Sequence, residues 1–274
     1  MDQFFLIPAA LLTGAVAGLL GGLLGIGGGV IIVPALILAL DLDPRFAPEH
    51  TTIVAVATSL SCVLGVSLSA ARAQLRAGNV SWSIVGRWGP FLVLGALLAA
   101  PVAEQLPLPV FRTAIGAFLA FAALVMLTRW QPDPGRTDPP LGLVAPIATA
   151  GGLVSGLAGI GGGNVIVPTL VYFNVPMHRA TANSSTLGVP IASAGALAYL
   201  VAGLSNPDLA LPPGTWGYVY WPASLAVIGT AMAAAPLGVR IAQRIDPVPL
   251  RRLFGLLLLF VAGRMLYSAL GFVS

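Results

Sequence analysis

The sequence predicts an all-α polytopic membrane protein built from two homologous repeats. Of its 274 residues, 57% are hydrophobic and only 8% are charged, whereas an ordinary soluble domain carries roughly 25% charged residues. Residues 4–40 hold no ionisable side chain, and apolar runs of about 18 residues or more can cross roughly 30 Å of hydrocarbon. Residues 25–34 recur, nearly letter for letter, as residues 159–168. The chain is therefore expected to sit in a lipid bilayer and to contain an internal duplication.

Residues 4–24 form the first predicted helix. A cleaved signal peptide would need a basic segment ahead of the apolar run, but Asp2 is the only charge at this end of the chain. We therefore expect this segment to be kept as part of the fold.

Each half of the chain is expected to hold five helical segments. In the first repeat, residues 1–130, they cover residues 4–24, 26–40, 51–73, 82–103 and 110–129. In the second repeat, residues 141–274, they cover residues 141–158, 160–173, 180–202, 216–241 and 250–270. Residues 131–140 are polar and rich in proline, so they cannot span a membrane and are predicted to be a cytoplasmic linker.

The duplication extends well beyond the glycine-rich motif. The two motifs lie 134 residues apart, and Gly18 and Gly22 match Gly152 and Gly156 at the same spacing. Residues 55–59 align with residues 180–184, and near the ends of the halves three further residues align in the same order. These are Arg112, Gly116 and Met126 of the first half, with Arg251, Gly255 and Met265 of the second. We infer that the halves are homologous along their whole length.

The arginines predict that the two repeats have inverted topology. Basic residues in short loops stay in the cytoplasm, and Arg72, Arg76 and Arg87 flank one loop of the first half. The equivalent loop of the second half, residues 203–208, has no arginine. Equivalent loops therefore face opposite sides, which requires an odd number of crossings in each repeat.

Five crossings satisfy this condition, and so do three crossings plus a re-entrant hairpin with the glycine motif at its tip. The segments that follow the motifs have only about 15 residues, or roughly 22 Å of helix, which is short for a full span. They favour a broken or re-entrant helix pair. A repeat of four crossings is the alternative; it would make the halves parallel and place both termini on the same side.

The glycine motifs are the candidate binding site. Four glycines in five residues cost a helix about 1 kcal/mol each relative to alanine, so we expect the chain to leave the helix there. Backbone N–H groups would then be exposed, and new helices would start at Val30 and Val165 with a partial positive charge that favours an anion. The residues predicted to supply these N–H groups are Gly27, Gly28, Gly29, Gly161, Gly162 and Gly163. The alternative is that the glycines serve close helix packing.

Small polar side chains follow on the next helix of each half. Thr58 and Ser59 occupy the positions that Asn183 and Ser184 occupy in the second half. They could bind substrate oxygens or make hydrogen bonds between helices. Asn164 directly follows the second set of glycines, where its carboxamide could donate to a substrate or cap the new helix.

Charged candidates are few. Arg264 lies within the last predicted helix, where it could pair with an anion or extend to the membrane surface. His50 and His178 are predicted to lie in loops, with a proton-linked role as the minority interpretation. No Asp or Glu falls in the middle of a predicted helix.

The composition excludes several function classes. Without lysine there is no Walker-type phosphate loop, and the few histidines and the lone cysteine leave no metal-ligand spacing. A serine hydrolase would need a base near Ser59 or Ser184. The 13 arginines are dispersed between apolar runs, so nucleic acid is not an expected partner. We predict no enzyme, no cofactor and no metal.

The sequence resembles the TauE/SafE sulfite exporter family over essentially the whole chain. Two features carry this resemblance: the doubled Gly-Ile-Gly-Gly-Gly motif with its closing proline, and the Ala-x-Ala-Thr-Ser-Leu element that follows at residues 55–60. The resemblance implies a multi-pass secondary transporter of small, often sulfur-containing anions in the cell inner membrane. Its site would lie between the repeats near the membrane centre, with access alternating as one repeat rocks against the other. An uncoupled channel or uniporter, and a scaffold that transports nothing, are the alternatives. A coupling proton and an oligomeric state stay open.

Overall fold

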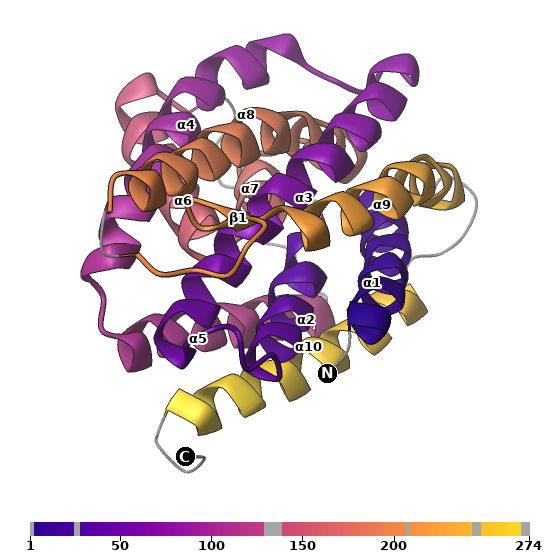
Figure 1. Cartoon of the computed structure of the whole chain (residues 1–274). Coiled ribbons are helices and arrows are strands. Elements are labelled where there is room, and N and C mark those ends of the chain that lie inside the picture. Colours follow the sequence, from indigo (N-terminus) through magenta and orange to yellow (C-terminus); the bar gives the residue numbers. More distant parts are fainter. Residues whose placement is uncertain (1–2, 25–27, 129–138, 207–208, 243–247, 270–274) are drawn as a thin grey trace.

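The computed structural model describes residues 3–24, 28–128, 139–206, 209–242 and 248–269, which form ten helices and one short hairpin (Figure 1). In the first half the helices are α1 Gln3–Leu24, α2 Gly29–Asp41, α3 Pro48–Arg76, α4 Trp82–Gln105 and α5 Leu108–Leu127. In the second they are α6 Leu141–Leu157, α7 Gly163–Tyr172, α8 Met177–Leu204, α9 Trp221–Ala242 and α10 Val248–Ala269. Strands β1 Thr215–Trp216 and β2 Val219–Tyr220 pair antiparallel between α8 and α9.

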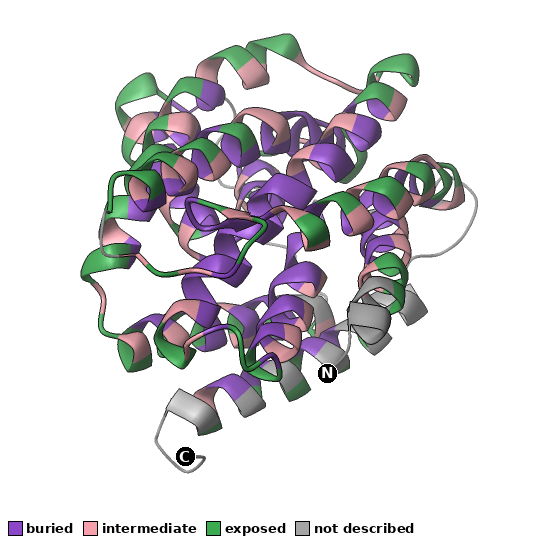
Figure 2. Cartoon of the chain, in the orientation of Figure 1, coloured by how far each residue is buried: buried purple, intermediate pink, exposed green. Residues whose placement is uncertain are grey.

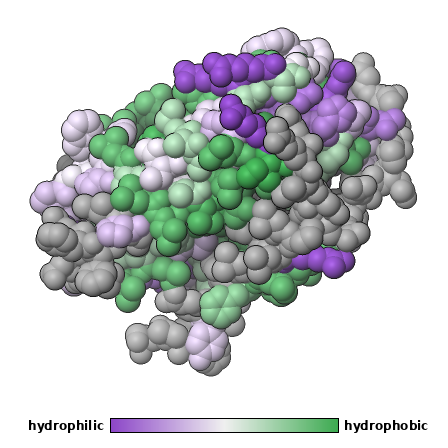
Figure 3. All heavy atoms as spheres, turned by 90° about the vertical axis from the view of Figure 1, so that its right-hand side faces the viewer, coloured by the Kyte–Doolittle hydropathy of each residue, from purple (hydrophilic) through white to green (hydrophobic). Residues whose placement is uncertain are grey.

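The prediction of a helical membrane protein is confirmed. Among the described residues, four helices are long and apolar enough to cross a membrane, namely α3, α4, α8 and α9. By contrast, α2 and α7 have only 13 and 10 residues. Figure 3 shows hydrophobic side chains spread across the middle of one face of the molecule, with hydrophilic ones gathered along its upper edge. Large apolar side chains such as Leu12, Leu225 and Phe260 are exposed, as expected for helices that contact lipid.

Helices α3 and α8 form the centre of the molecule. Residues 51–63 of α3 are all buried, and Figure 2 shows this helix buried along most of its length. A Cβ atom placed on Gly188 of α8 would lie 2.6 Å from Ser67 Oγ, and one on Gly195 would lie 2.9 Å from Leu60 Cδ1. The contact therefore moves back along α3 as it moves forward along α8, so the two helices are antiparallel.

Glycines let the outer helices approach one another closely. Helix α1 packs along α9, and α6 packs along α4. A Cβ atom on Gly18 would overlap the carbonyl oxygen of Ala231, and one on Gly152 would overlap that of Leu92. The first helix of each half therefore packs against the fourth helix of the other half, through backbone contacts that larger side chains would prevent.

Three predicted boundaries are wrong in an informative way. Helices α2 and α7 begin at Gly29 and Gly163, one and two residues before the predicted starts at Val30 and Val165. Helix α9 begins at Trp221, and residues 215–220, predicted as its first turns or the loop before it, form the hairpin. Gly214 with φ +92° and Gly217 with φ +53° turn the chain there, a conformation that glycine adopts readily. The all-α prediction missed this hairpin.

Two predicted loop residues lie in helices. Helix α3 begins at Pro48 and α8 at Met177, so His50 and His178 lie in first helical turns. The reason is that Pro48 at the first helical position and Pro176 just before α8 fix backbone angles that suit a helix start.

Candidate functional site

Each glycine motif ends one helix and begins another. Gly28 and Gly162 both adopt the left-handed conformation, with φ values of +74° and +81°, and each is the N-cap of the helix that follows. No side chain caps either helix, so N–H groups of their first turns are left without the usual capping partner. A helix N-terminus carries a partial positive charge. Both helix starts are therefore candidate places for an anion.

The two glycine breaks touch each other at Val63 of α3. A Cβ atom on Gly29 would lie 2.6 Å from the carbonyl oxygen of Gly159 and 2.9 Å from Val63 Cγ2. One on Gly161 would lie 2.8 Å from Val63 Cγ1. A side chain at Gly29 would push the two glycine breaks apart, and one at Gly161 would displace Val63. We call this region, residues 28, 29 and 159–163 with Val63, the central crossing.

Polar side chains of α3 hold the backbone of the second half in place. Ser59 Oγ donates a hydrogen bond to the carbonyl oxygen of Gly159 at 2.8 Å. Thr58 Oγ1 accepts one from the backbone N–H of Tyr220 at 3.0 Å. Both side chains are fully buried. Thr58 and Ser59 therefore make hydrogen bonds between segments of the protein, which was the alternative to their binding a substrate.

Asn183 of α8 has the corresponding role toward the first half. Its Oδ1 accepts a hydrogen bond from the backbone N–H of Ser81 at 2.9 Å, and its Nδ2 donates to the carbonyl oxygen of Arg179 at 2.7 Å. Trp82 follows Ser81 and starts α4, as Trp221 follows Tyr220 and starts α9. Thr58 and Asn183 therefore each fix the start of the fourth helix of the other half. Trp221, not Trp216, is the residue equivalent to Trp82.

Asn164 is the clearest candidate for contact with a substrate. It is the second residue of α7 and is 8% exposed, and its Nδ2 has no hydrogen-bond partner in the described part of the chain. Gly162 is the N-cap and no side chain caps α7, so the interpretation of Asn164 as a cap is wrong. A buried amide without a partner costs about 1–3 kcal/mol, which a bound ligand or water would offset.

Ser67 is a site residue that the sequence interpretation missed. Its hydroxyl is buried, has no partner among the described residues, and would lie 3.3 Å from a Cβ atom on Gly161. Ser59, Val63 and Ser67 are four residues apart along α3 and so share one helix face. That spacing is the signal that could have found Ser67. Ser185 of α8 also has a buried hydroxyl without a partner in these segments.

Of the remaining predicted site residues, one is buried on α8 and two lie outside what the structure describes. Ser184 is 1% exposed and lies beside Asn183 on α8. Gly27 and the side chain of Arg264 lie outside the described residues.

A polar cavity of about 630 Å³ lies away from the central crossing. Glu49 and His50 of α3 and Glu104 of α4 line it, together with Tyr218. Tyr218 Oη donates a hydrogen bond to Glu104 Oε1 at 3.1 Å, and burial together with that carboxylate raises the pKa of the Tyr218 hydroxyl. An imidazole and two carboxylates therefore share one open cavity.

Comparison with known proteins identifies the family. The model of the family described as "Sulfite exporter TauE/SafE" matches residues 10–265. The chain is 29% identical to a "Probable membrane transporter protein" of Haemophilus influenzae, over 96% of this chain and 99% of that protein. It is 30% identical to a protein of the same description from Methanocaldococcus jannaschii, over 91% of each. These relatives are described as transporters, in agreement with the prediction that the protein is not an enzyme. The chain is a membrane transporter and belongs to the TauE/SafE sulfite exporter family.

Proposed function

We propose that the protein moves a small sulfur-containing anion, such as sulfite or an organosulfonate, across the cell inner membrane, and that the anion binds at the central crossing. One observation carries this proposal: at the central crossing the uncapped start of α2 contacts the second glycine motif, which leads into the uncapped start of α7, and a left-handed glycine is the N-cap of each helix. Successive backbone N–H groups at a helix start form an anion-binding concavity. An oxyanion with three oxygens can accept several of these hydrogen bonds at once.

Buried polar side chains would complete the coordination of the anion. Among the described residues, Asn164 Nδ2 on α7 and the hydroxyls of Ser67 on α3 and Ser185 on α8 are buried without a hydrogen-bond partner. Thr58, Ser59 and Asn183 are hydrogen-bonded to backbone groups, so their part is to position the surrounding segments. For Ser184, Gly27 and Arg264, substrate contact stays a prediction.

The packing supports two repeats of inverted topology. Helices α3 and α8, which occupy equivalent places in the two halves, are antiparallel at their contact. A two-fold axis that exchanges antiparallel helices is perpendicular to them, and for membrane-spanning helices it lies in the membrane plane. The reciprocal contacts of Thr58 with Tyr220 and of Asn183 with Ser81 have the same symmetry. Together with the arginine distribution, they favour an odd number of crossings in each repeat, and the short lengths of α2 and α7 favour three crossings plus a re-entrant pair over five crossings.

Such an arrangement supports alternating access as the transport mechanism. Inverted repeats exchange conformations when one rocks against the other, which exposes a central site to each side in turn. The bonds of Thr58 and Asn183 join the two halves, so they are among the contacts that such a motion would stretch.

The polar cavity lined by Glu49, His50 and Glu104 favours a proton as the coupling ion over an uncoupled channel. Groups of carboxylate and imidazole side chains serve as proton relays in pumps and transporters. An imposed pH gradient separates the two candidates, because it should drive anion accumulation only in a coupled transporter.

The test is transport by the purified protein in liposomes. We expect saturable uptake of radiolabelled sulfite that methanesulfonate inhibits. Asn164→Leu and Ser67→Ala should each lower uptake about tenfold, since each removes a hydrogen bond to the anion worth about 1.4 kcal/mol. Ser193→Ala is the matched control, because Ser193 is exposed on α8 and bonds only its own helix. Uptake no faster than in empty liposomes would contradict the proposal and favour a scaffold.

A further inference from the structure

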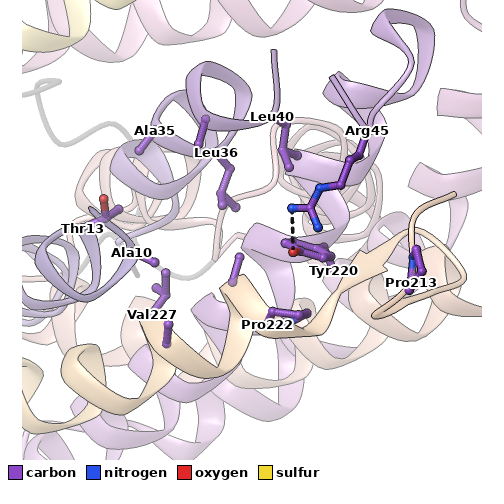
Figure 4. Close-up of a pocket in the computed structure, with 13 residues that line it drawn as sticks. Ala10, Thr13, Ala35, Leu36, Leu40, Arg45, Pro213, Tyr220, Pro222 and Val227 are labelled. Carbon is purple, nitrogen blue, oxygen red and sulfur yellow. Dashed lines mark hydrogen bonds between the residues drawn. The ribbon is translucent and has the colours of Figure 1, made fainter. Parts of the chain in front are cut away.

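A second cavity, of about 300 Å³, lies between α1, α2 and α9 (Figure 4). Ala10 of α1, Ala39 of α2 and Ala226 of α9 contribute to its walls. Arg45 and Tyr220 lie at one end of it, and Figure 4 shows the guanidinium of Arg45 directed toward the Tyr220 hydroxyl. The cavity therefore combines an apolar interior with a single cationic group.

The guanidinium of Arg45 is held in place but keeps a free edge. Its Nε donates to Asp43 Oδ1 at 3.0 Å, and its Nη2 donates to Asp43 Oδ2 at 2.6 Å. Nη2 also lies 3.5 Å from Tyr220 Oη. Among the described residues Nη1 has no hydrogen-bond partner, and the Arg45 side chain is 36% exposed. A ligand that comes from water can reach this edge and receive two N–H bonds from Nη1.

The size and walls of the cavity suit an anion that carries an apolar group. A volume near 300 Å³ is at the lower end for pockets that bind small molecules. Alanine and leucine walls offer nothing to a bare oxyanion, which loses hydration on entering. An alkyl group gains about 0.8 kcal/mol for each CH₂ that it buries there.

A cavity recurs at the equivalent place in the other half. It measures about 470 Å³, and Arg87 and Phe173 help to line it. With Trp82 equivalent to Trp221, Arg87 corresponds to Ala226, and at the spacing of the glycine motifs Phe173 corresponds to Ala39. Both halves therefore keep a hollow and an arginine at this place, but the second half has Trp88 and Phe173 where the first half has Val227 and Ala39.

We propose that the cavity between α1, α2 and α9 is a binding subsite for an organic anion. The charged group of the anion binds Nη1 of Arg45 beside the Tyr220 hydroxyl, and its apolar group lies against the alanines. The inference rests on the transport of an anion proposed above and adds a place where the substrate is held before it reaches the central crossing. It predicts that organosulfonates bind more tightly than sulfite.

The experiment is a calorimetric titration of the purified full-length protein with linear alkanesulfonates from methane- to hexanesulfonate. In the unmodified protein, affinity should rise about fourfold with each methylene until the cavity is full. Ala39→Phe introduces the residue type that the second half has at the equivalent position, Phe173. It should abolish the rise in affinity with chain length. Ala114→Phe is the matched control, because Ala114 is exposed on α5. The double variant Asp43→Asn with Arg45→Gln should lower the affinity for every sulfonate about tenfold or more, without leaving Asp43 buried and unpaired.

An affinity that does not depend on the length of the alkyl chain would disprove the subsite. So would equal affinities of the Ala39→Phe and Ala114→Phe variants for the longer sulfonates. A phospholipid that co-purifies with the protein and is displaced by Ala39→Phe would also overturn it, because the cavity would then be a lipid site. Sulfite uptake in liposomes separates the two proposals. If sulfite uptake is normal but sulfonate affinity does not depend on chain length, only the subsite is contradicted. If sulfonate affinity depends on chain length but no sulfite is taken up, only the transport function is contradicted.

Discussion

The hydroxyl of Thr58, in the middle of the most buried helix, accepts a hydrogen bond from the backbone N–H of Tyr220, 3.0 Å away and 162 residues later in the chain. Tyr220 ends the β-hairpin and precedes α9. The ring of Tyr220 also packs edge-on against Phe46, with centroids 5.3 Å apart. Through this one residue, the loop after α2, the centre of α3 and the start of α9 are joined.

Replacing Thr58 with valine should therefore destabilise the protein. Valine has nearly the shape of threonine but leaves the N–H of Tyr220, which is 7% exposed, without an acceptor. The expected loss is about 1–3 kcal/mol in the free energy of unfolding, measured as a lower midpoint of thermal unfolding in detergent. Thr58→Ser keeps the hydroxyl and should be much less affected. Equal midpoints for the two variants would show that the hydrogen bond contributes nothing.

Gly28→Ala and Gly162→Ala should impair transport to different degrees. Each places alanine at a positive φ, at a cost of about 1–2 kcal/mol. At Gly28 the new Cβ would also lie 2.7 Å from the backbone oxygen of Ala17, whereas at Gly162 it meets only the side-chain ends of Ile166 and Ile191. Gly28→Ala should therefore lower sulfite uptake more.

Gly86→Ala is the control for these two variants, because a Cβ there meets nothing within 4 Å. The comparison is made on protein that elutes as a single folded species in size-exclusion chromatography. If folded Gly28→Ala and Gly162→Ala both transport like Gly86→Ala, the glycine breaks are not the anion site.

The stability contributed by Asp43 should depend on pH. The hydrogen bond from the Arg45 guanidinium holds the pKa of the Asp43 carboxyl below its ordinary value of 3.8. A carboxyl with a lowered pKa stabilises the folded state above its ordinary value, and the stabilisation disappears as the pH falls through the lowered pKa. The unfolding midpoint of the wild type should exceed that of Asp43→Asn near pH 7, and the difference should shrink below about pH 4. A difference that stays constant down to about pH 3 would assign the stabilisation to something other than this ion pair.

Cysteine labelling should place the two equivalent loops on opposite sides of the membrane. Ala77 and Ser205 are both exposed, and Ala77 avoids the positive φ of its neighbour Gly78. A membrane-impermeant maleimide should label Ser205→Cys in intact cells, and Ala77→Cys only after permeabilisation. The wild type is the unlabelled control, because Cys62 is fully buried. Labelling of both positions from the same side would make the repeats parallel.

The sequence predicted the helices and the breaks because both depend on local properties. Long apolar runs can only be spans, and four glycines in five residues can hardly stay helical, so the ends of α1 and α6 were placed to within one residue. The starts of α2 and α7 were placed one or two residues late. Which glycine turns left-handed depends on neighbouring backbone, such as Ala17 beside Gly28, and no local pattern contains that contact.

The contacts of the site residues could not be predicted from local pattern. Thr58 and Ser59 were expected near the glycines, and Ser59 does bond to Gly159. The partner of Thr58 belongs to a hairpin at residues 215–220, most of which was predicted as the first turns of the helix over residues 216–241. Ser67 lies at the central crossing only because α8 offers Gly188 opposite it, a contact that appears only when the two halves are packed together.

The pairing of α1 with α9 has a consequence for how the protein is made. Helix α1 leaves the ribosome before α9, but its glycine face at Gly14, Gly18 and Gly22 is covered by residues 227–235 of α9. About two hundred residues of synthesis separate the two partners, at roughly 5–20 residues per second. For that interval, on the order of ten seconds or more, the glycine face of α1 lies in the bilayer without its contact to α9. The pairing of α1 is complete only when α9 has been inserted.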